Sequence, residues 1–151
     1  MKVFRPIVLA AFFLCFGIEA TILQAMAASD KPLPNATSAY VHLAIYSGLP
    51  DDPFWSLSPA LTAELLGRLR ALEVTNETPP VEFLGMAYVE LREQDKPVGR
   101  LMIYRGFVTV DDLQGGHFRY SDPGRKLQSW LISTGHLDAV RQSVADTWLW
   151  R

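Results

Sequence analysis

The only cysteine of the chain, Cys15, lies near the N-terminus in an uninterrupted apolar run of 12 residues, Ile7 to Ile18. Lys2 and Arg5 precede this run, and Ala25-Met26-Ala27 follows it. A basic start, a short apolar segment and an Ala-x-Ala site are typical of a secretory signal peptide, and the run is shorter than the ~20 residues that span a bilayer. We therefore expect cleavage after Ala27, and the competing interpretation is an uncleaved N-terminal anchor.

Cleavage after residue 27 would leave 124 residues with no cysteine, 12 basic and 15 acidic side chains, and a net charge of −3. Without cysteine the exported chain has neither a disulfide nor a thiolate metal cluster, so its hydrophobic core alone must stabilise it. The weakly acidic balance offers no basic surface for nucleic acid. We expect a periplasmic or secreted protein that contacts the membrane only through its signal peptide. The sequence leaves its oligomeric state open.

The remaining chain reads as a short leader followed by one domain. Residues 28–39 contain prolines and small side chains without an apolar period, which predicts a flexible leader. Residues 40–151 are expected to form a single α+β domain. Its first strand, residues 40–46, alternates so that Val41, Leu43 and Ile45 face the core.

Three helices are expected. Ser58 as N-cap, Pro59 in the first turn and leucines at 61, 65, 69 and 72 predict the first helix. Residues 125–134 predict a second helix that Gly135 ends in a left-handed conformation. Leucine and valine at helical spacing from Leu137 to Trp148 predict a third.

Further strands are expected over residues 82–93, 98–104 and 107–110, with a four-residue turn at 94–97. Ala87, Val89 and Leu91 alternate with outward side chains, including Tyr88. The polar segment 111–124 predicts a loop. The fold class expected is therefore α+β, with a small antiparallel sheet of about four strands packed against two or three helices.

The segment Ser47-Gly48-Leu49-Pro50-Asp51-Asp52-Pro53-Phe54-Trp55 predicts a rigid aromatic loop. Asp51 and Asp52 are either turn residues or ligand contacts, because Asp before Pro commonly initiates turns and the Asp-rich pattern of a calcium loop is absent. Trp55 either packs back on the first turn of the following helix or grips a partner or a sugar ring.

The start of the second helix is the other candidate site. Asp122 is expected to cap it, and Arg125, beside the helix N-terminus, is the candidate ligand of an anion. The three histidines, His42, His117 and His136, are far apart in sequence and lack the close pair of a zinc site. We predict no catalytic residues, no metal site and no cofactor.

Two elements of this sequence resemble a family of small exported bacterial proteins of uncharacterised function. The loop that ends at Trp55 is similar to a Ser-Gly-x-Pro-x-Pro-x-Trp element, although it has one more residue between the prolines. The residues Asp122, Arg125, Leu127, Trp130 and Leu131 match an Asp-x-x-Arg-x-Leu-x-x-Trp-Leu helix. The resemblance covers about residues 40–135. It implies one folded unit in a bacterial envelope and implies no activity.

The sequence favours a small binding or inhibitor-like envelope protein that uses the loop residues 48–55 and exposed tyrosines, namely Tyr88, Tyr104 and Tyr120. Its partner is expected to be an envelope or extracellular protein. One alternative is a hydrolase in which His117, Asp122 and Asp51 or Asp52 converge at one end of the sheet. The other is a structural protein without a ligand.

Overall fold

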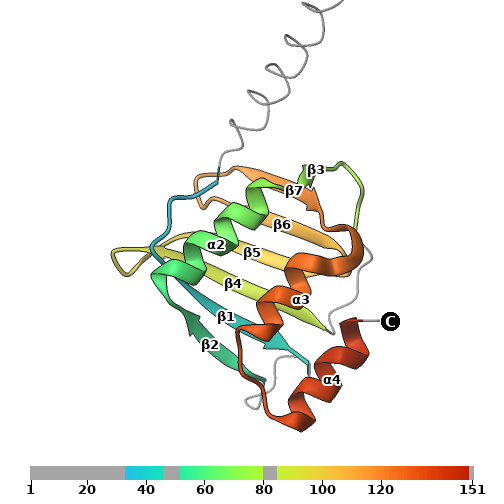
Figure 1. The fold of residues 1–151 in the computed structure, drawn as a ribbon. Coiled ribbons are helices and arrows are strands. Elements are labelled where there is room, and N and C mark those ends of the chain that lie inside the picture. The colour runs from blue at the N-terminus through green and yellow to red at the C-terminus, as the bar shows by residue number, and fades with distance from the viewer. Residues whose placement is uncertain (1–32, 46–51, 80–84, 150–151) are drawn as a thin grey trace, which may run out of the picture. The chain divides into compact units, whose positions relative to one another are not determined.

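A seven-stranded sheet with helices on one face forms the architecture of this protein (Figure 1). The computed structural model describes residues 33–45, 52–79 and 85–149. The strand order is β2-β1-β4-β5-β6-β7-β3, and each neighbouring pair is antiparallel. The expected α+β class is confirmed, but the sheet has seven strands where the sequence predicted about four.

The strands are β1 (Ser38–Ala44), β2 (Phe54–Leu57), β3 (Glu73–Val74), β4 (Met86–Glu93), β5 (Lys96–Tyr104), β6 (Phe107–Asp111) and β7 (His117–Ser121). The helices are α2 (Pro59–Arg70), α3 (Lys126–Ser133) and α4 (Ala139–Leu149), with a short 3-10 turn, η1 (Pro123–Arg125), before α3.

Strand β1 begins at Ser38, inside the segment 28–39 expected to be a flexible leader. Ala39 is fully buried, and Leu33 and Ala36 pack against the core. Their small or branched apolar side chains fill the space beside the sheet, which the proline-based prediction overlooked. Val41 and Leu43 face the core as expected.

Helix α2 agrees with its sequence prediction. The Ser58 hydroxyl accepts a hydrogen bond from the backbone N–H of Leu61 at 3.3 Å, and Pro59 occupies the first turn, where its missing N–H removes no helical bond. Leu65 and Leu69 are fully buried against the sheet. The four-residue spacing of leucines therefore marks the face that packs.

The meander β4-β5-β6 is confirmed, but its turns are tighter than predicted. Gln94 and Asp95 alone connect β4 to β5, both with positive φ, 50° and 64°. Arg105 and Gly106 connect β5 to β6 with φ of 45° and 84°. Two residues with positive φ form the turn type whose twist matches antiparallel strands. Lys96, expected in the first turn, instead begins β5.

Three short strands were not predicted. Phe54 and Trp55, expected in a loop, form β2 together with Ser56 and Leu57, and residues 117–121, expected in a polar loop, form β7. Each has only four or five residues, too few for alternation to stand out from the neighbouring turn residues. Strand β3 has two residues and follows α2.

The second helix is shorter than predicted, because α3 starts at Lys126 after the 3-10 turn and ends at Ser133. The left-handed residue beyond its end is His136, with φ of 46°, and the prediction that Gly135 takes this conformation is wrong. Gly135 has a different role, because it lies against the ring of Trp55. Helix α4 lies where the third helical stripe was expected.

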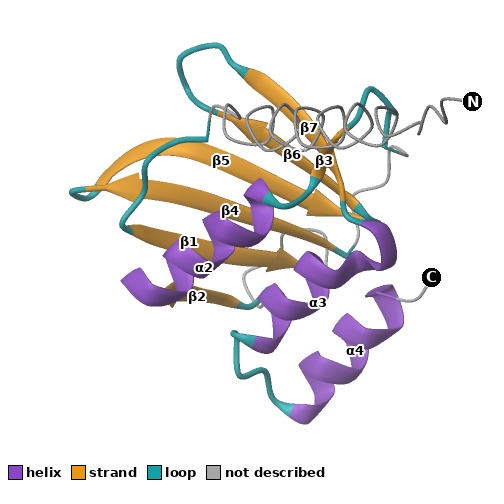
Figure 2. Cartoon of the chain, turned by 45° about the horizontal axis from the view of Figure 1, so that its top comes forward, coloured by secondary structure: helices purple, strands orange, loops and turns teal. Residues whose placement is uncertain are grey.

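Helices α2 and α3 lie over the same face of the sheet, and α4 lies beside α3 (Figure 2). The hydrophobic core fills the space between these helices and the strands and includes Leu101, Ile103, Val108 and Leu131. No helix in the described part of the chain covers the opposite face. We call it the open face of the sheet, although Met86 and Tyr104, which lie on it, are buried.

Two of the three tyrosines expected to be exposed are buried. Tyr120 has no exposed surface and belongs to the core, and Tyr104 is only 3% exposed. Burial raises the pKa of the Tyr120 phenol above its ordinary value. Tyr88 is exposed as predicted.

Candidate functional site

The carboxylate of Asp52 is buried and closes the end of strand β1. Its Oδ1 accepts a hydrogen bond from the backbone N–H of Ile45 at 3.0 Å, and its Oδ2 lies 4.0 Å from His42 Nε2. The side chain of Asp52 has no exposed surface, whereas that of His42 is 45% exposed. The Asp52 carboxylate is therefore engaged within the fold, at the end of β1. Asp51, the other acidic candidate, lies outside the described residues.

Trp55 links strand β2 to the turn between α3 and α4. Its indole Nε1–H donates a hydrogen bond to Thr134 Oγ1 at 2.9 Å. A Cβ added to Gly135 would lie 3.1 Å from three ring atoms, so the indole rests directly on the glycine backbone. Trp55 is thus held by the end of α3, not by the first turn of α2, which was one prediction from the sequence.

The N-terminus of α3 is occupied by the chain's own carboxylate. Asp122 is almost fully buried, and its oxygens accept the backbone N–H groups of Leu127 at 3.0 and 3.1 Å and of Gln128 at 3.2 Å. The predicted cap is therefore present. Arg125 lies beside it in the left-handed conformation, with φ of 54°. Because Asp122 already satisfies these N–H groups, the helix end does not offer them to an external anion.

The residues of the hydrolase alternative do not converge. His117 contacts Asp111, directly opposite it on the neighbouring strand. Asp122 follows the other end of β7, five residues along an extended chain and so ~16 Å away. Asp52 lies next to β1, four strand spacings or ~19 Å across the sheet. The described residues also contain no cluster of three side chains able to hold a metal ion.

The structure does bring together four aromatic side chains on the open face of the sheet, and we call Tyr40, His42, Phe54 and Tyr88 the aromatic patch. His42 lies opposite Phe54 on one side and opposite Tyr88 on the other, so these three form one row across β2, β1 and β4. Phe54 is 80% exposed, Tyr40 44% and Tyr88 40%. Three of the five most exposed large apolar residues described therefore lie on three adjacent strands.

Stacking and ion pairing order the patch. The His42 and Tyr88 rings stack with centroids 6.3 Å apart. The guanidinium of Arg92 lies 4.9 Å from the centre of the Tyr40 ring and donates a hydrogen bond to Glu90 at 2.6 Å. That bond to Glu90 raises the pKa of the Arg92 guanidinium, which is a cation in any case and lies over the tyrosine ring. Three of the four rings, Tyr40, His42 and Tyr88, are thus held in place.

A pocket of about 390 Å³ adjoins the patch at the outer edge of β2, and we call it the edge pocket. One wall is formed by residues 52–55, and the other by the turn between α3 and α4 and the first part of α4. Trp55 and Leu137 supply apolar surface. Asp138 and Arg141 form an ion pair of 3.2 Å at the rim, and the Asp138 carboxylate also accepts the backbone N–H of Arg141.

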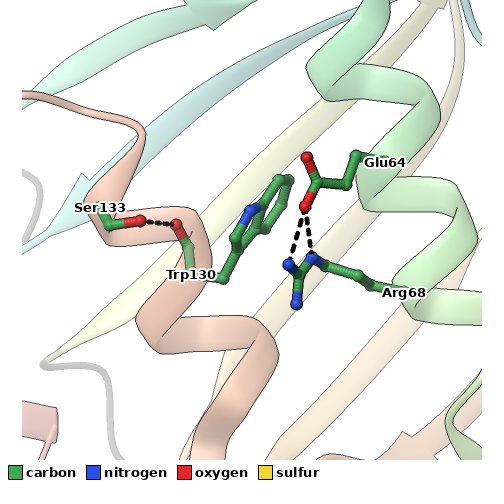
Figure 3. A network of polar contacts seen from close by, with 4 residues as sticks. All are labelled: Glu64, Arg68, Trp130 and Ser133. Carbon is green, nitrogen blue, oxygen red and sulfur yellow. Dashed lines mark hydrogen bonds and ion pairs between the residues drawn. The ribbon is translucent and has the colours of Figure 1, made fainter.

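A second cavity, of about 400 Å³, lies between the end of α2 and the start of α3. Lys126 and Arg68 lie along it, but Arg68 is already engaged. Its guanidinium binds the Glu64 carboxylate at 2.7 and 2.9 Å and lies 4.8 Å from the centre of the Trp130 ring, as Figure 3 shows. This arrangement joins α2 to α3 and is explained by packing between the helices.

The sequence indicated only part of the patch. The alternation pattern correctly placed Tyr88 on the outward face, and it placed Tyr40 and His42 on the face opposite the core residues of β1. Phe54 lies within the loop 48–55 that was expected to bind, but it was not singled out, because β2 was not expected to be a strand. The neighbouring Trp55 was the aromatic residue named as a possible ligand contact, but its ring is held by its own chain.

Comparisons with protein-family models, with curated proteins and with solved structures found no match. None of the described helices has both the length and the apolar character needed to cross a membrane.

Proposed function

We propose that this chain is an exported binding protein whose aromatic patch docks onto a partner protein of the bacterial envelope or the extracellular medium. The contiguous exposure of Tyr40, Phe54 and Tyr88 on the open sheet face carries this proposal. Export rests on the signal-peptide pattern of residues 1–27.

A protein partner suits the chemistry of the patch. Scattered exposed apolar residues are ordinary, but contiguous exposed apolar patches mark interaction sites. Aromatic side chains and arginine are enriched where proteins meet, because they bury a large area with few rotatable bonds. Tyr40 and Arg92 supply such a pair, and the Glu90 carboxylate holds it in position.

The binding role is favoured over hydrolysis because of where the carboxylates lie. Asp122 and Asp52 both accept backbone hydrogen bonds within the fold, and His117 pairs with Asp111 on β7 and β6, toward the other edge of the sheet from the patch. These carboxylates therefore do not gather with His117 into one site. In contrast, the Phe54 side chain of the aromatic patch has no stacking or cation–π contact with another described residue.

The experiment compares the binding of Phe54→Ala and Tyr88→Ala variants with that of the unaltered chain. The tagged protein is isolated from its native envelope, the co-purifying protein is identified, and its affinity is then measured with purified components. We expect each substitution to weaken binding by about 10- to 30-fold, the effect of losing an interface aromatic. Leu113→Ala is the matched control, because Leu113 is also an exposed apolar residue but lies between β6 and β7.

Equal affinities for all three variants would contradict the proposal, as would loss of binding in the Leu113 variant alone. Failure to recover any partner under conditions in which the fold persists would favour the structural role instead.

A further inference from the structure

Strand β2 forms one end of the sheet and pairs only with β1 among the described strands. An end strand carries backbone N–H and C=O groups that point away from the sheet and can pair with another extended chain. Native proteins commonly block such edges with charge or with a covering segment. Residues 54–57 of this chain carry no charge, and no described strand pairs with their outer side. The turn between α3 and α4 faces the start of β2 across the edge pocket.

The hydrogen bonds identify which groups face outward. The backbone N–H of Leu43 donates to the carbonyl of Pro53 at 2.9 Å, so these two residues form a hydrogen-bonded pair between β1 and β2. In an antiparallel ladder such pairs alternate with pairs that exchange no hydrogen bond. Trp55 and Leu57 therefore point their backbone groups toward β1. Phe54 and Ser56 point theirs toward the open edge.

The edge pocket lies beside these same residues. A strand placed along β2 would alternate its side chains between the two faces of the sheet. Side chains opposite Phe54 would extend the aromatic patch on the open face. Side chains opposite Trp55 would fall on the helix side, where the edge pocket is lined by Leu137 and by the pair Asp138 and Arg141.

We propose that the partner is bound as an extended polypeptide segment that pairs with β2 as an eighth strand. The segment receives backbone hydrogen bonds from Phe54 and Ser56, places an apolar side chain beside Phe54, and inserts the next side chain into the edge pocket. This inference rests on the proposed function and specifies how the partner is recognised.

A second copy of this chain does not satisfy the same geometry. In a β2–β2 pair that sets the outward residues Phe54 and Ser56 opposite each other, the side chain facing the edge pocket would be the Trp55 of the other copy. That ring is held against Gly135 of its own chain by the hydrogen bond to Thr134 and is not free to enter the pocket. We therefore assign the occupant to a segment of a different protein.

The test uses synthetic peptides selected from a random display library on the purified full chain. Ser56→Pro removes one outward N–H without removing a hydrogen bond to β1, and an end strand accepts proline at such a position. We expect at least about tenfold weaker peptide binding. Ser56→Ala keeps the N–H and is the matched control, with an expected change below about twofold.

Two measurements keep the test valid if the proline variant does not fold. Peptides N-methylated at single positions should lose affinity at every second residue, which is the period of strand pairing. In the unaltered protein, the amide hydrogens of Phe54 and Ser56 should become protected from exchange when the peptide binds.

Any of three results would overturn this inference. N-methylation could weaken binding equally at all positions, the Phe54 and Ser56 amides could stay unprotected when the peptide binds, or the library could yield no binding peptide. If Tyr88→Ala weakens binding of the envelope partner while Ser56→Pro does not, the proposed function stands and pairing at the edge fails. If Ser56→Pro weakens binding while Tyr88→Ala has no effect, pairing at the edge stands and the role of the patch fails.

Discussion

Replacing Trp55 by phenylalanine tests whether this ring is fixed by its own chain. The substitution removes the 2.9 Å hydrogen bond to Thr134 Oγ1, at a cost of about 1 kcal/mol. The smaller, half-buried ring loses packing on Gly135, which adds about 0.5–1 kcal/mol. We therefore expect the free energy of unfolding to fall by about 1.5–2 kcal/mol.

Urea unfolding followed by circular dichroism measures this change, and a double-mutant cycle with Thr134→Val isolates the hydrogen bond. Because the Thr134 hydroxyl also donates to the carbonyl of Leu131 at 2.6 Å, Thr134→Val has a cost of its own. The cycle should nevertheless return a coupling of about 1 kcal/mol between the two side chains.

Trp130→Phe is the matched control, since Trp130 is also half-buried but its indole makes no hydrogen bond among the described residues. It should lose the packing contribution and part of the cation–π contact with Arg68, but no hydrogen bond. A coupling near zero between Trp55 and Thr134, together with equal losses for the two tryptophans, would refute the assignment of Trp55 as the link between β2 and the end of α3.

Two further substitutions test the fold that supports the site. Asp122→Asn should lower the free energy of unfolding by about 2 kcal/mol in urea titration, because the buried carboxylate accepts two backbone N–H groups at a helix N-terminus. Asp112 also accepts two backbone N–H groups, but in a more exposed loop, so Asp112→Asn should cost less. Equal losses for the two variants would contradict the capping role of Asp122. Gly106→Ala should lower the free energy of unfolding by about 1–2 kcal/mol, because φ of Gly106 is 84° and the new Cβ would lie 3.2 Å from the Asp122 carbonyl oxygen. Gly67→Ala should raise the melting temperature, because Gly67 lies on the exposed side of α2 and no atom lies within 4 Å of the new Cβ. A melting temperature that moves in the same direction for both variants would contradict this.

Regular periodicity made the central elements predictable from the sequence. Helix α2 combines a cap, a proline in its first turn and leucines at helical spacing, so several independent signals agree. Strands β1, β4 and β5 each have seven residues or more, and β1 and β4 alternate clearly. These elements fixed the α+β class and the meander.

The sheet edges were not predictable in the same way. Strands β2 and β3 have four and two residues, and their extended conformation depends on partners far away in sequence, β1 and β7. The same limit applies to the site. The exposure of Phe54 follows from the register His42 opposite Phe54, which only the folded sheet establishes.

The exposure of individual aromatic side chains was not predictable from the sequence for a related reason. The sequence left Trp55 either packed on its own chain or in contact with a ligand, and it placed Tyr104 and Tyr120 among the exposed rings. In the fold, a glycine and a threonine hold Trp55, and both tyrosines are buried. A neighbour on the sheet, Phe54, is the ring left without internal contacts of this kind.

Binding of a partner at the aromatic patch and the adjoining edge of β2 can be mapped by NMR. Backbone and ring chemical shifts of the isotopically labelled protein are recorded with and without the recovered partner. Changes are expected to concentrate at Phe54, Ser56, Tyr40 and Tyr88. Changes centred instead on the cavity near Arg68 and Lys126, with the patch unaffected, would contradict binding at the patch.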